Sequence, residues 1–348
     1  MKRCIITILF FISMLPYAYS QISSNTPNKK SYSDTESIAV YDSTKFQWGD
    51  NALKSFVGQQ FIGFCTSTDK KFGYVSIELF TKKNDSNKRY MPTYNGLYTR
   101  CEAIEGKTFT VIDTDEDSID KWFLLQDNNN PKLKLWYKWN GVLNGPFIVV
   151  SNYNYLCDKY IGMKFRPILK HKPDVAQETF FVNDTDLESG EKIPFDPTDI
   201  WECISFSQLE GKGEIVSIVK NQKGNISYIS IPRLIPNEYY GSLLGKKSTQ
   251  KMVLFEEEFA TLADKYGLLT MARFMTGNID KGMNIELLYL MKGKPKTINR
   301  STFSDSQFVY EFVLSYFGSD AQYHKKKVTQ YYYVDEATGE IKDWSQLN

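Results

Sequence analysis

The chain carries few side chains whose type and spacing could support catalysis. It has two histidines, His171 and His324, among 348 residues. Histidine is the side chain that exchanges protons most readily near neutral pH. Here, however, one lies in a basic segment bounded by prolines and the other precedes three consecutive lysines. The sequence contains no metalloprotease, serine-hydrolase or nucleotide-binding motif. We therefore expect no catalytic residue.

Two acidic runs, residues 113–117 and 184–188, have the composition of calcium-binding loops. The first lacks the glycine at the sixth position and the bidentate glutamate at the twelfth position of an EF-hand loop. We interpret both runs as acidic surface turns, and we expect no metal ion and no cofactor. A carboxylate pair for glycoside hydrolysis stays an open alternative, because such a pair is defined by a distance in space.

Aromatic residues make up 15 % of the chain, with 23 tyrosines and 23 phenylalanines. They suit β-strands, and they also suit surfaces that bind sugars or proteins. Trp136, Tyr137 and Trp139 form the candidate binding cluster. If the three side chains are exposed and coplanar, they indicate glycan binding. An apolar patch or a free sheet edge would instead indicate protein binding.

Four of the five cysteines lie beyond the N-terminal segment: Cys65, Cys101, Cys157 and Cys203. An even number in an exported protein is compatible with disulfides. The wide spacings, without a Cys-x-x-Cys pair, argue against a zinc cluster. Buried free thiols among apolar neighbours are the alternative, and the sequence does not decide between the two.

The N-terminus has the three parts of a secretory signal. Lys2 and Arg3 precede an apolar run from Ile5 to Leu15, and small residues precede Gln21. We predict cleavage after Ser20 and export to the periplasm or the cell surface. The apolar run is shorter than the roughly 20 residues of a membrane-spanning helix. The remaining cysteine of the chain precedes this run, so we do not expect a lipoprotein.

The charge balance restricts the class of partner. The chain has 42 basic and 41 acidic residues, and removal of Lys2 and Arg3 leaves 40 against 41, a net charge of −1. Nucleic acid and anionic membranes attract proteins with a large positive charge. We therefore expect neither as the main partner, and no integral membrane span after signal cleavage.

Most of the chain before residue 240 alternates apolar and polar residues in short runs separated by Gly, Asn and Pro. This pattern predicts antiparallel strands in small barrels or sandwiches. About 330 mature residues exceed the size of a usual single core. The expected organisation is a signal peptide (1–20), a flexible leader (21–45), a first β-domain (46–150), a second β-domain (151–240) and an α+β domain (249–348).

A weak repeat supports two related β-domains. Residues 57–63 resemble residues 157–165, and residues 97–107 resemble 200–206 with the Gly211-Lys212 that follows. In residues 97–107 and again in residues 200–206 we expect a strand that contains a cysteine and precedes a Gly-Lys turn. The period of about 100 residues suits two copies of one small domain.

The pattern changes period after residue 250. Apolar residues three and four apart from Met252 to Leu269 predict one long helix that ends by Gly277. A second helix follows at 284–292. Three strand patterns then occupy 306–314, 328–335 and 340–344, so two helices packed on an antiparallel sheet are expected.

The second helix has its ends encoded in the sequence. Asn284 is a helix-capping residue, and Glu286 places a carboxylate near the positive end of the helix dipole. Gly293 can adopt the left-handed conformation that closes a helix, and Pro295 prevents its continuation. Gly282 and Met283 precede the cap.

The spacing of Gly282, Met283, Glu286, Gly293 and Pro295 resembles the SmpA/OmlA (BamE-like) family of small bacterial envelope modules. The resemblance covers about 95 residues and implies a unit of two helices and three strands. It also implies a location in the cell envelope. The family's lipid-attachment cysteine is missing here, and a shared fold does not transfer an activity.

We therefore predict an exported, non-catalytic envelope protein that binds or scaffolds another envelope component, a protein or a glycan. The alternative is a carbohydrate-active protein or other hydrolase that uses carboxylates and surface aromatics.

Overall fold

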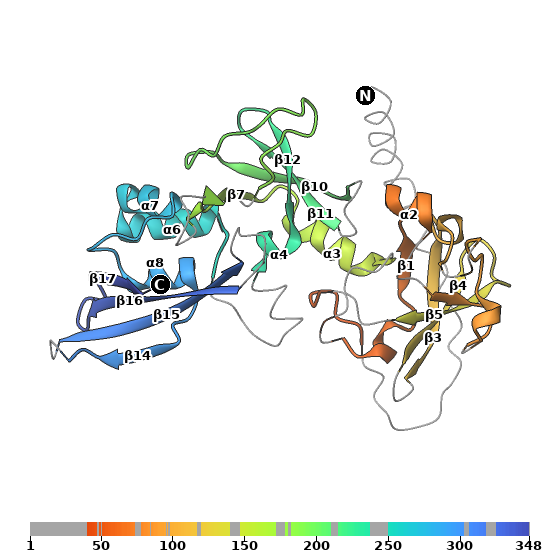
Figure 1. The fold of residues 1–348 in the computed structure, drawn as a ribbon. Coiled ribbons are helices and arrows are strands. Elements are labelled where there is room, and N and C mark those ends of the chain that lie inside the picture. Colours follow the sequence, from red (N-terminus) through yellow and green to blue (C-terminus); the bar gives the residue numbers. More distant parts are fainter. Residues whose placement is uncertain are drawn as a thin grey trace.

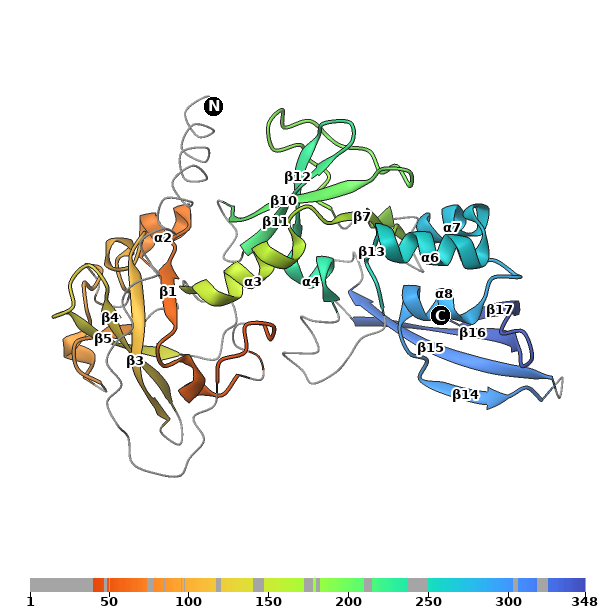
Figure 2. The ribbon, with the colours of Figure 1, turned by 180° about the vertical axis from the view of Figure 1, so that it is seen from behind.

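The computed structural model describes residues 40–46, 49, 51–73, 78–83, 85–94, 96, 98–116, 120–139, 147–171, 178–179, 182–209, 215–236, 250–302, 306–317 and 325–347. Within these ranges the protein is mostly β, and every pair of strands in its sheets is antiparallel. The prediction of a β-rich protein is confirmed. Both ribbon views place the second large sheet between the first and the third (Figure 1 and Figure 2).

The first sheet has six strands in the order β2-β5-β4-β3-β1-β6. Their bounds are β1 Gln60–Gly63, β2 Glu78–Phe80, β3 Thr108–Glu116, β4 Lys121–Asp127, β5 Lys134–Trp139 and β6 Phe147–Val149. Side chains alternate between the two faces of a strand, and in β4 this sends Phe123 and Leu125 into the first core. Trp122 lies on the opposite face.

The second sheet has five strands in the order β12-β11-β10-β7-β13. Their bounds are β7 Lys164–Pro167, β10 Trp201–Gln208, β11 Ile215–Asn221, β12 Ile226–Ser230 and β13 Val253–Phe255. A separate two-stranded sheet pairs β8 Lys170–His171 with β9 Glu178–Thr179. Helix α3, Val150–Tyr160, follows β6 without a loop and leads into β7.

Short helices connect the strands of the first two sheets. They are η1 Leu53–Phe56, α2 Ser67–Phe72, η2 Ser86–Lys88, η3 Cys101–Ala103 and α4 Ile231–Leu234. Phe72 begins an alternating run of apolar and polar residues that is typical of a strand, but it is the last residue of α2. The hydroxyl of Thr66 accepts a hydrogen bond from the amide of Asp69, and the Asp69 carboxylate accepts one from the amide of Thr66. This capping box fixes the start of the helix.

The two sheets repeat one strand order. The run β5-β4-β3-β1-β6 of the first corresponds to β12-β11-β10-β7-β13 of the second. In each copy a helix precedes the fourth strand of this run (β1 or β7), and an exposed aliphatic residue and a glycine with positive φ follow the helix. These pairs are Val57-Gly58 and Ile161-Gly162. The glycine N–H donates to the carbonyl of Val111 in one copy and of Cys203 in the other, both at 2.8 Å.

A β-bulge marks the same place in both copies. The register shifts between Val111 and Asp113 in β3, and between Cys203 and Ser205 in β10. Ile112 and Ile204 are therefore the extra residues of equivalent bulges. The two copies differ by 104 positions between β1 and β7 (165 minus 61) and by 92 between β3 and β10 (201 minus 109), because the intervening segment is shorter in the second copy.

This register corrects the second half of the predicted repeat. The partner of β10 is β3, whereas residues 97–107 do not form a strand in their described part. Cys101 begins η3 and is bonded to Cys65 across a sequence separation of 36 residues. Cys157 and Cys203 are free thiols. The sequence similarity was misleading there because both segments combine aromatic, aliphatic and cysteine residues before Gly-Lys.

The third sheet has the order β14-β15-β16-β17. Its strands are β14 Thr297–Arg300, β15 Gln307–Phe317, β16 Lys325–Asp335 and β17 Ile341–Leu347. Three helices accompany it: α6 Glu256–Tyr266, α7 Leu268–Met275 and α8 Ile285–Lys292. Helix α8 lies against one face of the sheet in both ribbon views (Figure 1 and Figure 2). Sequence analysis predicts three of these four strands, and β14 is the one it misses.

The prediction of one long helix from Met252 to Leu269 is wrong. Residues 253–255 form β13, which pairs with β7 of the second sheet. Gly267 has a φ of 84° and separates α6 from α7. Leu269 is 78 % exposed and does not belong to the apolar stripe. The misreading arises because a buried strand and an amphipathic helix both place apolar residues at short intervals.

Two residues in or next to strands of the second sheet, Ile168 and Leu254, belong to the third core. Ile168, just after β7, is fully buried in the cluster that contains Leu254, Met275 and Leu288. The amide of Leu169 donates to the carbonyl of Met275 at 2.9 Å. Ile168 therefore belongs to the third core, although it precedes the predicted range 249–348 in sequence.

Candidate functional site

The motif at α8 has a structural role. The side-chain oxygen of Asn284 accepts a hydrogen bond from the amide of Glu286 at 3.0 Å, and Met283 is buried in the third core. The amide of Gly282 donates to the carbonyl of Ile341 at 2.8 Å, which ties the helix start to β17. These contacts position the helix.

The end of α8 departs from its expected geometry. Gly293 has φ 82° and ψ −157°, so it does not adopt the left-handed helical conformation of the predicted cap. This region is accessible to glycine alone, and the chain turns away from the helix axis two residues before Pro295. The motif thus identifies the helix correctly, while its last turn closes by another backbone geometry.

Glu286 belongs to a small ion-paired group on the surface. Lys265 Nζ lies 2.6 Å from its carboxylate, and the hydroxyl of Tyr266 donates to the same oxygen. The hydrogen bond from Lys265 lowers the pKa of Glu286. A carboxylate held in its charged form by two donors is a poor general acid or base. Because Lys265 and Tyr266 belong to α6 and Glu286 belongs to α8, the role of this group is to connect the two helices.

The predicted aromatic cluster does not form one surface. Tyr137 is 1 % exposed and points into the first core, and Trp139 packs against the same core. Trp136 points to the opposite face of β5, because neighbouring strand residues alternate. The three rings are therefore not available together for stacking on a sugar.

The face that carries Trp136 is covered by cations. Lys83 Nζ lies 5.9 Å from the ring centre of Trp122 and 6.0 Å from that of Trp136, and it forms an ion pair with Asp115. Lys138 Nζ lies 5.7 Å from the Trp122 ring. Such contacts stabilise a fold by about 0.5–2 kcal/mol each. The arrangement buries Trp122 and connects the segment after β2, which contains Lys83, to strands β3, β4 and β5.

The remaining sequence candidates are accounted for by local structure. Described residues of the run 113–117 continue β3 as an extended strand. Asp186 of the run 184–188 accepts hydrogen bonds from the amides of Glu188, Ser189 and Ile226. Burial acts to raise its pKa, but these bonds hold the pKa below its ordinary value. Among the described residues no three potential metal ligands gather at one place.

The two histidines contribute no described side chain to a site. The backbone of His171 lies in β8, in a strand and not in the expected loop, and His324 lies outside the described residues. Within the described part of the chain, none of the helices has the length and apolarity that a membrane crossing requires.

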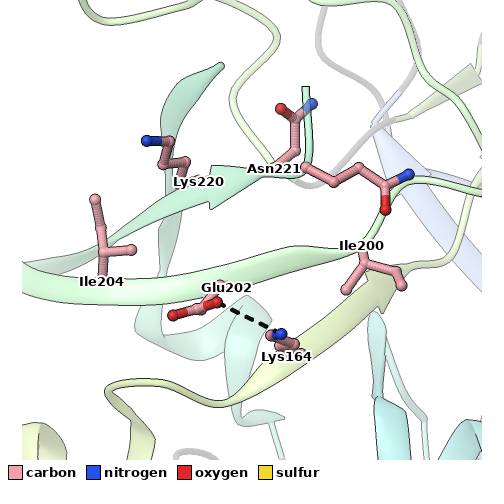
Figure 3. A pocket seen from close by; sticks show the side chains of 7 residues that line it. Lys164, Ile200, Glu202, Ile204, Lys220 and Asn221 are labelled. Carbon is pink, nitrogen blue, oxygen red and sulfur yellow. Dashed lines mark ion pairs between the residues drawn. The ribbon is translucent and has the colours of Figure 1, made fainter. Parts of the chain in front are cut away.

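A depression of about 330 Å³ lies on the second sheet (Figure 3). It extends over β7, β10 and β11, the three strands whose repeat counterparts form the middle of the first sheet. The lining residues are Lys164, Ile200, Glu202, Ile204, Lys220, Asn221 and Gln222. Charged and aliphatic side chains thus occupy the same hollow.

Strand register produces a row of three charges across this depression. Glu202 of β10 lies opposite Lys164 of β7 on one side and opposite Lys220 of β11 on the other. Lys164 Nζ is 3.9 Å from the Glu202 carboxylate, and the two side chains point towards one another (Figure 3). Lys220 has no acidic partner among the described residues, so the row carries a net charge of +1 and one uncompensated ammonium group.

The first sheet provides an internal comparison. The residues at the equivalent register positions are Gln60, Thr110 and Gln126. None of them is charged, although the backbone of this region has the same strand order and the same bulge. The charge row is therefore a property of the side chains of the second sheet and is not required by the fold.

A buried polar group supports one end of the depression. Asn221 is buried, and its side-chain amide donates to the carboxylate of Asp199 at 3.4 Å. Lys223 Nζ lies 2.8 Å from Asp199 and 2.7 Å from Asp196. The hydrogen bond from Lys223 lowers the pKa of Asp196 to about 2. Lys223 thus bridges two aspartates, which leaves this group with a net charge of −1, and the contacts hold the turn after β11 in place.

Comparison of the chain with family models, with curated proteins and with solved structures finds no match.

Sequence reasoning misses the depression because its charged residues lie far apart in the chain. Lys164 and Glu202 are separated by 38 positions (202 minus 164) and are joined through the pairing of β7 with β10. The available signal is the pair of charged residues Glu202 and Lys220 at non-core positions of β10 and β11, which becomes informative only once the register of these strands is known.

Proposed function

We propose that this is an exported, non-catalytic envelope protein that binds another envelope component through the depression on the second sheet. One observation carries the proposal: the row Lys164–Glu202–Lys220, which leaves the ammonium group of Lys220 without an acidic partner among the described residues, in a depression also lined by the exposed Ile204 and the half-buried Ile200. A polar and apolar surface hollow of this kind suits recognition of a partner. No described residue beside it has the geometry of a general base and a nucleophile held together.

We propose that the two related sheets are small β-domains that present this surface, and that the third part is an SmpA/OmlA-like unit. Supporting the second point are the Asn284 cap, the buried Met283 and the packing of α8 against an antiparallel sheet. The unit here has a fourth strand, β14, and a first helical segment divided at Gly267. These are additions to the two-helix, three-strand arrangement that the resemblance implies.

We further propose a periplasmic or cell-surface location, without a lipid anchor. The charged, apolar and small-residue parts of the N-terminal segment support it, and a disulfide between Cys65 and Cys101 suits an oxidising compartment. Mass spectrometry of protein from the envelope fraction tests this point. Gln21 should be the N-terminal residue, and an intact Met1 would contradict the proposal.

An affinity purification from envelope extract tests the binding function. The mature protein is compared with a Lys164→Glu/Lys220→Glu variant and with a Lys132→Glu/Lys192→Glu variant. The second variant has the same change in net charge at exposed positions outside the depression. We expect a component that the wild type and the control variant enrich and the depression variant does not. Equal enrichment by all three would reject the depression as the binding site.

The carbohydrate-active alternative loses its main support in the structure, because Tyr137 lies in the core and Trp136 is covered by Lys83. We therefore keep the binding function as the single proposal.

A further inference from the structure

The charge row in the depression has a spacing that a ligand must match. Lys164 and Lys220 lie on the two strands that flank β10. Neighbouring strands are about 4.8 Å apart, so the two lysine backbones are separated by about 9.6 Å across the sheet. Lys164 is directed at Glu202 and Lys220 points away from it (Figure 3), so the strand spacing describes the backbone positions and the flexible side chains adjust from there. A ligand with two negative groups roughly 9–10 Å apart, and a hydrogen-bond donor between them for Glu202, matches this backbone spacing.

A polypeptide in the polyproline II conformation has this repeat. It makes one turn in three residues and rises about 3.1 Å per residue, so side chains three positions apart point the same way at a distance of about 9.3 Å. Its backbone N–H groups have no internal partner. Two acidic side chains at positions i and i+3 can face the two lysines, while an amide between them faces Glu202.

The aliphatic lining favours a peptide over a carboxylated glycan. The bulge in β10 turns Ile204 outwards, where it is 37 % exposed, and Ile200 lines the other end of the depression. Removing an aliphatic side chain from water against another apolar group is favourable. A polypeptide offers acidic and aliphatic side chains in one strand, whereas an acidic polysaccharide offers the charges alone.

We infer that the depression binds an extended, acidic segment of a partner protein, with acidic residues three positions apart and aliphatic residues between them, lying across β7, β10 and β11. This inference rests on the proposed function and specifies its ligand. The first sheet serves as the natural control, because Gln60, Thr110 and Gln126 occupy the equivalent positions and offer such a segment no charge.

Binding of synthetic peptides to the mature full-length protein tests the inference. The probe is the twelve-residue peptide (Glu-Val-Pro)4, and its neutral counterpart is (Gln-Val-Pro)4. Ion pairs with exposed lysines are weak individually, so the two together should make the acidic peptide bind about tenfold more tightly than its neutral counterpart. The difference should shrink as salt is raised from 0.05 to 0.5 M, because salt screens exposed charges.

Charge reversal separates a lost interaction from a lost fold. The Lys164→Glu/Lys220→Glu variant should lose the preference for (Glu-Val-Pro)4 and acquire one for (Lys-Val-Pro)4, whereas Lys132→Glu/Lys192→Glu should behave as wild type. Binding of the reversed peptide shows that the variant is folded. A variant that binds neither peptide while its circular dichroism is unchanged would overturn the inference.

Two further results would also overturn it. One is equal affinity for (Glu-Val-Pro)4 and for a peptide of the same composition with its glutamates adjacent. The other is binding of polygalacturonate, a carboxylated glycan, as tight as that of the acidic peptide at equal carboxylate concentration. If envelope material is still captured through Lys164 and Lys220 while no acidic peptide binds, the proposed function stands and the peptide inference fails.

Discussion

Burial without a counter-ion sets the proton affinity of Lys292, the last residue of α8. Its Nζ lies 5.8 Å from the ring centre of Tyr332, and among the described residues no carboxylate pairs with it. Desolvation lowers the pKa of Lys292 to about 8, against about 10.4 for an exposed lysine. The fold therefore contains a half-buried ammonium group that opposes folding at neutral pH.

The first prediction concerns this residue. Between pH 8 and about 10.4 the unfolded chain holds a proton that the folded chain has lost, so stability from this group rises with pH across that window. Below pH 8 both states are charged, and the full unfavourable effect of burial is present. Lys292→Met should raise the free energy of unfolding by about 1–2 kcal/mol at pH 7, after allowance for the lost contact with the Tyr332 ring.

Urea denaturation of the wild type and the variant at several pH values measures this difference. The gap should narrow from pH 8 to pH 10, since the wild-type lysine becomes neutral. Lys294→Met, an exposed neighbour, should show no such trend. A variant less stable than wild type at pH 7 would mean that the ammonium group has a partner and is not merely desolvated.

The second prediction concerns Gly293. Its φ of 82° with ψ of −157° is a conformation that a β-branched residue reaches only with strain of about 1–3 kcal/mol. Gly293→Val should lower the free energy of unfolding by that amount, as measured by urea denaturation. Lys294→Val supplies the control for β-branching outside the constrained position. Equal stability of the two variants would show that α8 can end with an ordinary backbone conformation.

At the scale of elements, the disulfide between Cys65 and Cys101 closes the segment that joins β1 to η3. The closed loop spans 36 residues, and a cross-link of this length restricts the unfolded chain by about 2–4 kcal/mol in free energy. The third prediction is that Cys65→Ser/Cys101→Ser loses this amount of stability. Cys157→Ala serves as control, because its thiol is free. A loss below about 1 kcal/mol, or a non-reduced peptide map without this bond, would contradict it.

The strands were predictable where one face of a sheet is buried and the other is not. Residues 132–137 alternate in this way, and β5 is indeed found at Lys134–Trp139. Strand alternation was misleading around Phe72, where the capping box of Thr66 and Asp69 indicates a helix. Helical periodicity was misleading around Phe255, where a three-residue strand runs directly into α6. β14 carries mostly exposed residues, so it has no apolar periodicity to detect.

At the scale of the molecule, the repeat was recognisable but the site was not. Sequence similarity located the paired segments around Phe61 and Phe165, since both fill a core next to a glycine turn. The charge row required the register of three strands, and register depends on bulges and loop lengths that no local pattern specifies. A candidate site made from cross-strand neighbours therefore becomes visible only in the folded chain.

The fourth prediction concerns Ile168, which precedes the third part of the chain in sequence but belongs to its core. Ile168 is fully buried among residues of α7, α8 and β13, although it follows β7 in sequence. Ile168→Ala removes buried methyl groups and leaves a cavity, which should lower the free energy of unfolding by about 2–5 kcal/mol. Ile161→Ala, at a side chain that is 46 % exposed, is the matched control and should change it little.

Hydrogen exchange of the full-length variant shows where the stability is lost. If Ile168 supports the third core, amide protection should fall in α7 and α8, including the peptide that contains Met275, whose carbonyl accepts from Leu169. Protection in the first sheet should stay unchanged, because that sheet has a core of its own. Loss confined to β10, β11 and β12 would instead show that the second part unfolds alone and that the third does not depend on it.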